Sequence, residues 1–241
     1  MAKRKSKYEC VLIKLSGESF CPPGGFGIET SALSALVAEL LPAAEMGVRM
    51  GLVVGGGNFV RGRSLATIPS IQRATADYMG MLATVINALA LQDALEKAGV
   101  PTRVLGAITM TAVCEPFIRR RAIRHLEKGR VVILAGGTGS PFLTTDTCAA
   151  LRANEIGAEA LLKATKVEGV FDSDPVKNPS AKRYSRLTYQ KVLADRLGVM
   201  DLTAISMCME NRIPIIVFEL SKRGNLADVL SGEDVGTIIA E

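Results

Sequence analysis

The sequence predicts an α/β fold in which a mostly parallel sheet is covered by helices on both sides. Two observations support this. Short β-branched apolar runs alternate with longer segments of helical spacing, as in chains built from strand–helix–strand units. Three of these runs end in glycines, within Val11–Ser19, Met50–Arg61 and Val131–Ser140. The 241 residues, 48% of them apolar, suit one large domain with a sizeable core.

The expected strands are short runs rich in valine, isoleucine and leucine, bounded by glycine, proline or polar residues. In chain order they are Val11–Leu15, Leu52–Val54, Arg103–Ile108, Val131–Leu134, Ala160–Ala164, Ile215–Phe218 and Thr237–Ala240. The segment Thr165–Arg186 is rich in Asp, Pro, Ser and Asn, and we expect a long loop there. Loops of that length inside a compact domain are usually functional or disordered.

The expected helices lie between these strands, and glycines or capping residues mark several of their ends. They are Ser31–Met46, Ala74–Ala98, Phe117–Lys128, Thr145–Ile156, Tyr189–Arg196, Asp201–Asn211 and Asn225–Leu230. In the longest one, apolar residues from Met81 to Leu89 recur at helical spacing. Such a stripe is typical of a core or a subunit contact rather than of a cofactor site.

Composition argues against several classes of protein. The chain has no tryptophan and only 5% aromatic residues, so we expect no base-stacking surface for single-stranded nucleic acid. Part of the net charge of +5 lies in residues 1–7, which we expect to form a disordered basic tail before a single domain over 8–241. Lys14 interrupts the next apolar run, which argues against a signal peptide, and no stretch is expected to reach the ~18 apolar residues of a membrane span.

Cysteine and histidine chemistry is not expected either. The five cysteines form no C-x-x-C pair and are odd in number, so the sequence predicts reduced, buried thiols rather than disulfides or a zinc site. The single histidine, His125, lies among cations that oppose its protonation, which argues against a Ser-His or Cys-His mechanism. The basic cluster from Arg119 to Arg130 fits a solvated helix face better than a nucleic-acid patch, because no nucleic-acid-binding motif surrounds it.

The three glycine-rich turns predict an anion-binding edge of the sheet. Glycines let backbone N–H groups approach a ligand without an intervening Cβ, and oriented N–H groups bind anions. Open α/β sheets bind ligands at the carboxyl ends of their strands, where the turns are expected to lie. Lys14 ends one apolar strand and is either an edge lysine facing solvent or a cation beside a phosphate loop. Lys163 repeats this arrangement, and Arg61 lies within reach of the same cleft.

Fixed cations at this edge favour transfer of a phosphoryl group between two phosphate-bearing molecules. Two like unit charges about 5 Å apart repel by roughly 3 kcal/mol at an effective dielectric near 20, and cations, Mg²⁺ and loop N–H groups offset that repulsion. The candidate carboxylates also have structural explanations: Asp77 complements a helix dipole, Asp146 and Asp201 cap helices, and Asp174 lies in a turn. None has dedicated metal spacing, so Mg²⁺ is expected to arrive with nucleotide phosphates.

Several motifs recur in a specific order and spacing: KLSGE at Lys14–Glu18, GGFGI at Gly24–Ile28, GGGN at Gly55–Asn58, Arg61-Gly62, DYMGMLAT at Asp77–Thr84, GTGSPFLTTD at Gly137–Asp146, KATKVEGVFDSDP at Lys163–Pro175, LTY and VMDLTA. Together they resemble the amino-acid kinase superfamily, and within it the bacterial uridylate kinases, over almost the whole chain. The resemblance implies a three-layer αβα sandwich that transfers the γ-phosphoryl group of ATP to UMP. Its N-terminal part would bind UMP and its C-terminal part would bind ATP.

The resemblance also implies a role for each matching residue. The implied ATP site comprises Lys14, Leu15, Ser16, Gly17, Gly57, Arg61, Thr165, Phe171 and Asp174. The implied UMP site comprises Gly56, Asp77, Thr138, Gly139, Ser140, Pro141, Phe142, Leu143, Thr144 and Thr145. The implied catalytic residues are Lys14, Arg61, Asp146 and Lys163. Within these sets, Asp77 would read the ribose, Lys163 would neutralise the transferred group, and Asp146 would orient the lysines.

Members of this bacterial group are cytoplasmic hexamers of pyrimidine nucleotide biosynthesis, activated by GTP and inhibited by UTP. The residues that match the GTP region are Pro22, Pro23, Gly24, Gly25, Phe26, Gly27, Arg103 and Arg130. The sequence departs from the pattern at Ser140 and Glu159, and at Gln92 and Glu96, where basic residues are expected near GTP. The last two bear on GTP activation more than on catalysis. A kinase of another small acid and a nucleotide-binding protein without catalysis are the alternatives.

Overall fold

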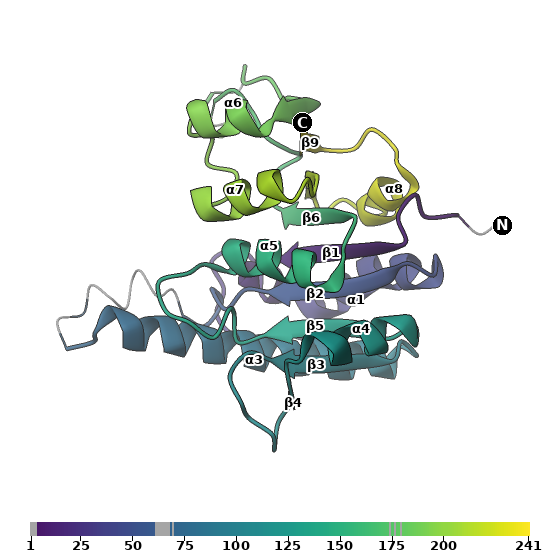
Figure 1. The fold of residues 1–241 in the computed structure, drawn as a ribbon, viewed down its shortest axis with the longest axis vertical. Coiled ribbons are helices and arrows are strands. Elements are labelled where there is room, and N and C mark those ends of the chain that lie inside the picture. The colour runs from purple at the N-terminus through teal and green to yellow at the C-terminus, as the bar shows by residue number, and fades with distance from the viewer. Residues whose placement is uncertain (1–3, 61–67, 69, 174, 176, 179) are drawn as a thin grey trace.

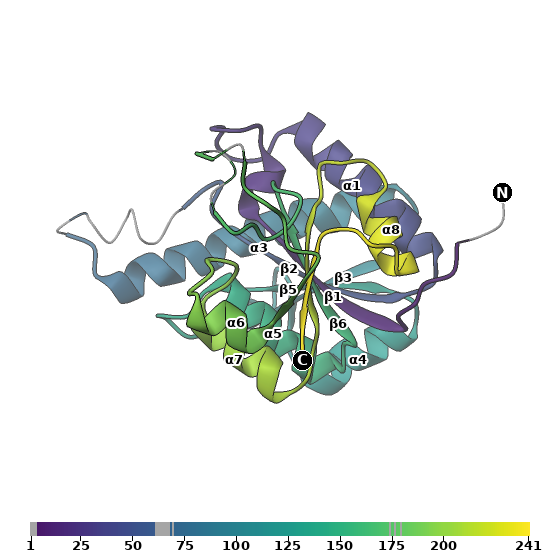
Figure 2. The same ribbon diagram turned by 90° about the horizontal axis from the view of Figure 1, so that it is seen from above.

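The computed structural model describes residues 4–60, 68, 70–173, 175, 177–178 and 180–241 (Figure 1). Arg61 and Asp174, both expected at the ATP site, lie outside the described residues. The described residues form a twisted sheet with helices on its two faces, which confirms the predicted αβα sandwich (Figure 2).

Within the described residues, nine strands form one sheet in the order β4-β3-β5-β2-β1-β6-β8-β9-β7. Their bounds are β1 (Cys10–Leu15), β2 (Arg49–Val54), β3 (Thr102–Gly106), β4 (Glu115–Pro116), β5 (Val131–Ala135), β6 (Ala160–Thr165), β7 (Arg186–Thr188), β8 (Ile215–Glu219) and β9 (Thr237–Ala240). The pairings are parallel except that of β8 with β9, which is antiparallel. The sheet is therefore mostly parallel, as predicted.

The helices divide between the two faces of the sheet (Figures 1 and 2). One face carries α1 (Thr30–Glu45), α3 (Arg73–Lys97) and α8 (Asn225–Ser231), and the other carries α4 (Arg119–Glu127), α5 (Thr145–Ile156), α6 (Tyr189–Ala194) and α7 (Leu202–Glu210). The alternation of side chains along a strand explains this division. In β1, Val11, Ile13 and Leu15 pack against the first group, while Cys10 and Leu12 pack against the second.

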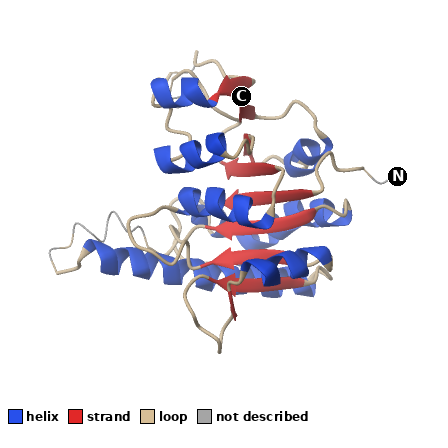
Figure 3. Cartoon of the chain, in the orientation of Figure 1, coloured by secondary structure: helices blue, strands red, loops and turns tan. Residues whose placement is uncertain are grey.

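Most predicted elements are found within three residues of their expected bounds (Figure 3). The differences concern short pieces: the 3₁₀ helix η1 (Gly17–Phe20), β4 and β7 were not predicted, and β7 begins where the expected long loop ends. The reading of Lys14 as an edge-strand lysine is wrong, because β1 is flanked by β2 and β6 on its two sides.

Helix α3 is, among the described residues, long and apolar enough by length and composition to cross a membrane. The expectation that no stretch would pass such a test is therefore wrong. In the structure, however, one side of α3 is buried in the core on the face of the sheet that also carries α1 and α8, through Val85, Ala88, Leu91 and Leu95. This burial is typical of a core helix. Its N-terminal part projects past the carboxyl ends of the strands (Figures 1 and 2).

The described part of the expected basic tail, residues 4–7, contacts α8. The backbone N–H of Lys7 donates to the carbonyl of Leu230 at 2.7 Å. The guanidinium of Arg4 pairs with Asp228. These contacts attach the beginning of the described chain to the helix next to the C-terminal strand.

A stability prediction concerns Gly236, which directly precedes the antiparallel strand β9. Its φ is +81°, and a Cβ here would lie 2.2 Å from the carbonyl oxygen of Val217 in β8. Gly236→Ala is therefore expected to lower the free energy of unfolding by about 2 kcal/mol or more, because neither the backbone conformation nor the space admits a side chain. Urea denaturation followed by circular dichroism measures the loss.

The matched control is Gly198→Ala. Gly198 has no described atom within 4 Å of the added Cβ and no positive φ, so this variant should keep the stability of the parent chain or gain a few tenths of a kcal/mol. Equal unfolding free energies for the two variants would contradict the prediction.

Candidate active site

Two lysines face each other across neighbouring strands at the carboxyl edge of the sheet. Lys14 in β1 and Lys163 in β6 occupy paired positions of the parallel register. Alternation puts both on the face of Leu12 and Leu161, which α5 covers. Their side chains are only 12% and 13% exposed. Two ammonium groups placed this way repel, so the arrangement requires a negative group between them.

Asp146 supplies that group. It lies in the first turn of α5, where the N-cap residue Thr144 accepts the backbone N–H of Asp146 at 3.0 Å. Its Oδ2 accepts from Lys163 Nζ at 2.7 Å, and its Oδ1 lies 3.0 Å from Lys14 Nζ. We call Lys14, Asp146 and Lys163 the charge triad. The expected role of Asp146 in orienting the two lysines agrees with this geometry.

Burial and charge act in opposite directions on the triad. Burial raises the pKa of Asp146, but the charges of Lys14 and Lys163 outweigh it and hold that pKa below its ordinary value. The stabilisation from this carboxylate is therefore present above its unfolded-state pKa and is lost as the pH falls through the lowered folded-state pKa. For Lys163, burial is the largest cause and lowers its pKa, while Asp146 opposes that shift.

One oxygen of the triad retains acceptor capacity. Lys14 is within ion-pair distance of Asp146 Oδ1, but its direction is poor for a hydrogen bond. The Lys14 charge is therefore the partner of this buried oxygen among the described residues. A carboxylate oxygen in this position can accept one further bond.

Glycine-rich loops lie beside the triad because they follow three neighbouring strands of the sheet, β5, β2 and β1. The loops after β1 and β2 touch: a Cβ on Gly17 would lie 2.5 Å from the backbone nitrogen of Gly57 and 2.9 Å from the carbonyl oxygen of Gly55. Only glycine at position 17 permits this approach. Ser16, also expected at the ATP site, caps η1 by accepting from Glu18 N at 3.3 Å.

A cavity of about 200 Å³ opens beside these loops, between α3 and the loop before α5. It collects most of the residues expected to bind UMP, and its described lining is Gly56, Gly57, Val60, Asp77, Gly80, Met81, Thr84, Gly137, Thr138, Leu143, Thr144 and Thr145. Gly139, Ser140, Pro141 and Phe142 complete the same loop. The structure therefore brings the two halves of the expected UMP site together.

Asp77 ties α3 to that loop. Its Oδ2 accepts the backbone N–H of Phe142 at 2.8 Å, and its two oxygens lie 2.9 and 3.0 Å from Arg73 Nε. Phe142 has φ +70°, a conformation that a bulky residue rarely adopts. The contact with Asp77 holds this strained backbone in place, as is common for loops at ligand sites.

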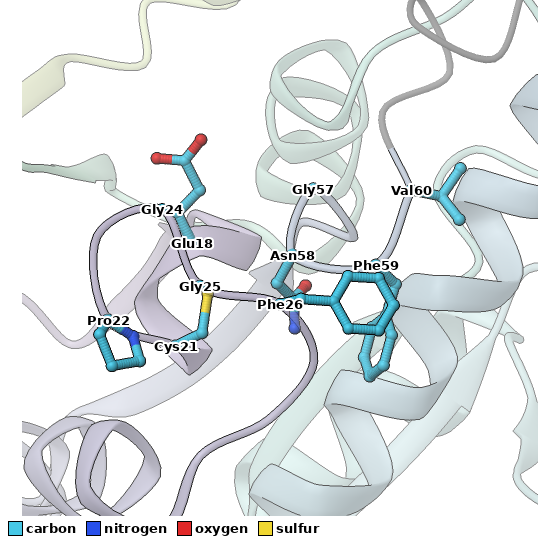
Figure 4. Close-up of a pocket in the computed structure, with 10 residues that line it drawn as sticks. All are labelled: Glu18, Cys21, Pro22, Gly24, Gly25, Phe26, Gly57, Asn58, Phe59 and Val60. Atoms are coloured by element: carbon cyan, nitrogen blue, oxygen red, sulfur yellow. The ribbon is translucent and has the colours of Figure 1, made fainter.

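A larger cavity of about 430 Å³ lies on the other side of the Gly57–Val60 turn (Figure 4). The loop from Pro22 to Gly27, expected in the GTP region, forms one wall of it. The other two residues expected there lie elsewhere: Arg103 lines a cavity of about 350 Å³ with Gln92, and Arg130 donates to His125 Nδ1 at 2.9 Å. Arg103 and Arg130 lie close together at the paired strands β3 and β5, and neither lines the cavity beside the Pro22–Gly27 loop. The GTP region stays a prediction.

The residues expected on the ATP side continue from β6. Thr165 ends that strand, and its hydroxyl donates to the carbonyl of Val167 at 2.7 Å. Phe171 pairs with Arg183 in an isolated β-bridge within the long loop. Lys166 reaches back across the cleft to Glu18 at 2.7 Å.

Sequence reasoning missed several residues that fix the site. The Lys166–Glu18 ion pair had no signal in the sequence, because the two residues are 148 positions apart, one in η1 and one directly after β6. Asp201 caps α7 at Ala204 N, as predicted, but it also accepts from Thr147 Oγ1 on α5 at 2.8 Å. Asn87 is fully buried on α3. A polar residue inside an apolar helix was a signal that could have identified it.

Similarity to known proteins identifies the family of this chain. Residues 9–219 match the amino acid kinase family. The chain is similar to the crystal structure of UMP kinase from Bacillus anthracis, with 40% identity, 97% of this chain and 96% of that chain covered, and a TM-score of 0.94. It is also similar to UMP kinase from Ureaplasma parvum, with 35% identity, coverage of 98% and 100%, and a TM-score of 0.90.

A third similar structure is uridylate kinase from Archaeoglobus fulgidus, with 28% identity, 95% of this chain and 99% of that chain covered, and a TM-score of 0.71. The family match spans most of the sequence, and two of the similar structures exceed 30% identity over nearly their whole lengths. The chain therefore belongs to the amino acid kinase family.

Proposed function

We propose that this protein is a UMP kinase, which transfers the γ-phosphoryl group of ATP to UMP and yields ADP and UDP. The observation that carries the proposal is the charge triad at a crevice between two glycine-rich loops, with the expected UMP residues gathered in the adjoining cavity. The similar structures from Bacillus anthracis and Ureaplasma parvum are both UMP kinases. The two lysines supply the positive charge that a transferred phosphoryl group requires.

The proposed reaction needs no general base, because the accepting phosphate oxygen of UMP is already anionic. Catalysis then rests on alignment of the two nucleotides and on stabilisation of charge in the transition state. Lys14 and Lys163 approach the transferred group from neighbouring strands, and Asp146 holds both ammonium groups in place. Asp77 and the Thr138–Thr145 loop would hold UMP from the other side.

Mg²⁺ is proposed to enter with ATP, held chiefly by the phosphates as this ion usually is. Among the described residues, no group of three or more His, Cys, Asp or Glu could hold a metal ion. Asp146 Oδ1, which is buried and is paired with Lys14 alone among the described residues, is the protein oxygen we propose for a ligand role there. When bound, the ion supplies further neutralisation of phosphate charge.

Self-association is proposed from the outer face of α3. Tyr78, Met79, Leu82 and Ile86 are large hydrophobic residues on this helix and are between 37% and 49% exposed. Apolar groups gathered on one helix face are typical of an interface. The hexamer, the cytoplasmic location and a place in pyrimidine nucleotide biosynthesis remain predictions from the family resemblance.

Control by GTP and UTP also remains a prediction. The guanidinium of Arg103 is already paired with Glu96 at 2.7 Å and donates to the carbonyl of Thr102 at 2.6 Å. An incoming triphosphate would have to compete with that carboxylate for the arginine. We therefore expect weaker GTP activation than in relatives with a basic residue at position 96.

The proposed function is tested by ADP release with ATP–Mg²⁺ and one of four acceptors: UMP, CMP, glutamate or carbamate. UMP should give the highest kcat/KM. Turnover of glutamate or carbamate without turnover of UMP would identify a kinase of another small acid. Release of no ADP with any acceptor would favour a nucleotide-binding protein without catalysis.

Lys14→Ala is expected to lower kcat by at least ~100-fold, because it removes a contact that matters most in the transition state. Steady-state kinetics with UMP and ATP measure the loss, and circular dichroism checks the fold. Lys191→Ala is the matched control, since Lys191 is an exposed lysine of α6 paired only with nearby Asp195 among the described acids. A kcat for Lys14→Ala within a few fold of this control would refute the role of Lys14.

Asp77→Asn is expected to raise the KM for UMP by about tenfold or more while leaving the KM for ATP nearly unchanged. The substitution removes the charged acceptor at the wall of the UMP cavity and weakens the hold on Phe142 N. Asp93→Asn, an exposed change on the same helix, is the control and should alter neither KM. An effect of Asp77→Asn confined to ATP would contradict the assignment.

A further inference from the structure

Two asparagines form a buried pair behind the glycine-rich loops. Asn58 follows the Gly55–Gly57 turn and is 3% exposed, and Asn87 lies in the middle of α3 and is 0% exposed. Asn58 Nδ2 donates to Asn87 Oδ1 at 2.9 Å, and Asn87 Nδ2 donates to Asn58 Oδ1 at 2.7 Å. The two amides therefore bind each other reciprocally.

The remaining amide N–H groups of the pair bind two different loops. Asn87 Nδ2 donates to the carbonyl of Gly55 at 2.8 Å, and Asn58 Nδ2 donates to the carbonyl of Gly27 at 2.7 Å. All four N–H groups of the pair are thus used. A fully satisfied buried network of this kind is rigid, because each broken bond leaves a polar group without water.

Asn58 is also the contact between three chain segments. The backbone N–H of Gly27 donates to the carbonyl of Asn58 at 3.0 Å, so Asn58 binds both backbone groups of Gly27. A Cβ on Gly17 would lie 2.8 Å from Asn58 Oδ1, so the loop after β1 packs directly on the amide. Figure 4 shows Asn58 between the Gly57 turn and the Gly25–Phe26 loop.

We propose that Asn87, acting through Asn58, is a positioning residue for phosphoryl transfer. It fixes the Gly55–Gly57 turn against Gly17, and so sets the distance between the two loops that receive phosphates beside the charge triad. The inference deepens the proposed function and rests on it, because its effect is expected in transfer from ATP to UMP. Neither asparagine lines the cavity assigned to UMP.

Stability alone does not require this pair. Replacing both partners of a buried hydrogen bond with apolar groups of similar shape is often nearly neutral. The surrounding core on this face of the sheet is apolar and includes Ala88, next to Asn87, and Leu91, one turn further along the same helix. Amide hydrogen bonds, unlike apolar contacts, are directional, so each N–H fixes the position of one carbonyl, here one in each of two loops. A site that aligns two phosphate groups needs loops fixed in this way.

The test compares Asn87→Ala with Leu91→Ala. Leu91 lies one helical turn further along α3, is 0% exposed, and has no polar contact with the loops, so its truncation costs core packing only. At a temperature where circular dichroism shows both variants folded, Asn87→Ala is expected to lower kcat by at least ~10-fold with KM values changed less than about threefold. Leu91→Ala should keep kcat within about twofold.

A double-variant cycle separates positioning from general damage. Asn58→Ala and the combined Asn58→Ala/Asn87→Ala variant should both lose about as much kcat as Asn87→Ala, because the two amides act as one unit. Losses that multiply across the two sites, or a kcat for Asn87→Ala equal to that of Leu91→Ala, would overturn the inference.

The wild-type chain distinguishes this inference from the proposed function. If it forms no UDP, the proposed function fails, and the inference is then decided by calorimetric titration with ATP–Mg²⁺. Asn87→Ala should change the geometry of bound ATP, seen as an altered binding enthalpy and a Kd raised up to about threefold, and Leu91→Ala should change neither. Unchanged ATP binding in Asn87→Ala would overturn the inference in that case.

Discussion

A single buried carboxylate between two lysines is the interaction on which the rest of the site depends. Lys14 and Lys163 are paired across β1 and β6, where their charges would repel without Asp146. Two consequences follow from its place at the start of α5. The helix must begin at the carboxyl edge of the sheet, and the loop before it, which carries the expected UMP residues, must end there. Charge balance and the position of the loop expected to bind UMP are therefore set by the same turn of helix.

Helix α3 fixes the loops from the opposite face. Asp77, Thr84 and Asn87 recur at helical spacing, so they lie along one side of the helix. The Asp77 carboxylate accepts the backbone N–H of Phe142, and the Thr84 hydroxyl accepts that of Gly136 at 2.8 Å. The Asn87 amide donates to the carbonyl of Gly55. One rigid element thus holds the loops after β2 and β5. Its outer face, in contrast, carries exposed apolar side chains, so the proposed self-association surface and the contacts that hold the loops belong to the same helix.

Much of this could be predicted from the sequence, because apolar strands ending in glycines are local patterns. Lys14 and Lys163 could be placed at strand ends, but not opposite each other, since the β1–β6 register joins residues far apart in the chain. The short strands β4 and β7 carry too few residues for a periodic signal. The Asn58–Asn87 pair depends on how α3 packs beneath the loops, and Arg103 could not be known to pair with Glu96. Each of these features depends on contacts between segments that are far apart or are packed together only in the folded chain, so no local sequence pattern predicts it.

The most direct test of the account is the titration of Lys163, followed by NMR in protein with ¹³C-labelled lysine and assigned with Lys163→Arg. Burial lowers the pKa of Lys163 and the Asp146 carboxylate raises it, so the pKa should lie below the ordinary lysine value and fall further in Asp146→Asn. A pKa of Lys163 that is the same with and without the Asp146 charge would contradict the claim that this carboxylate holds the two lysines together.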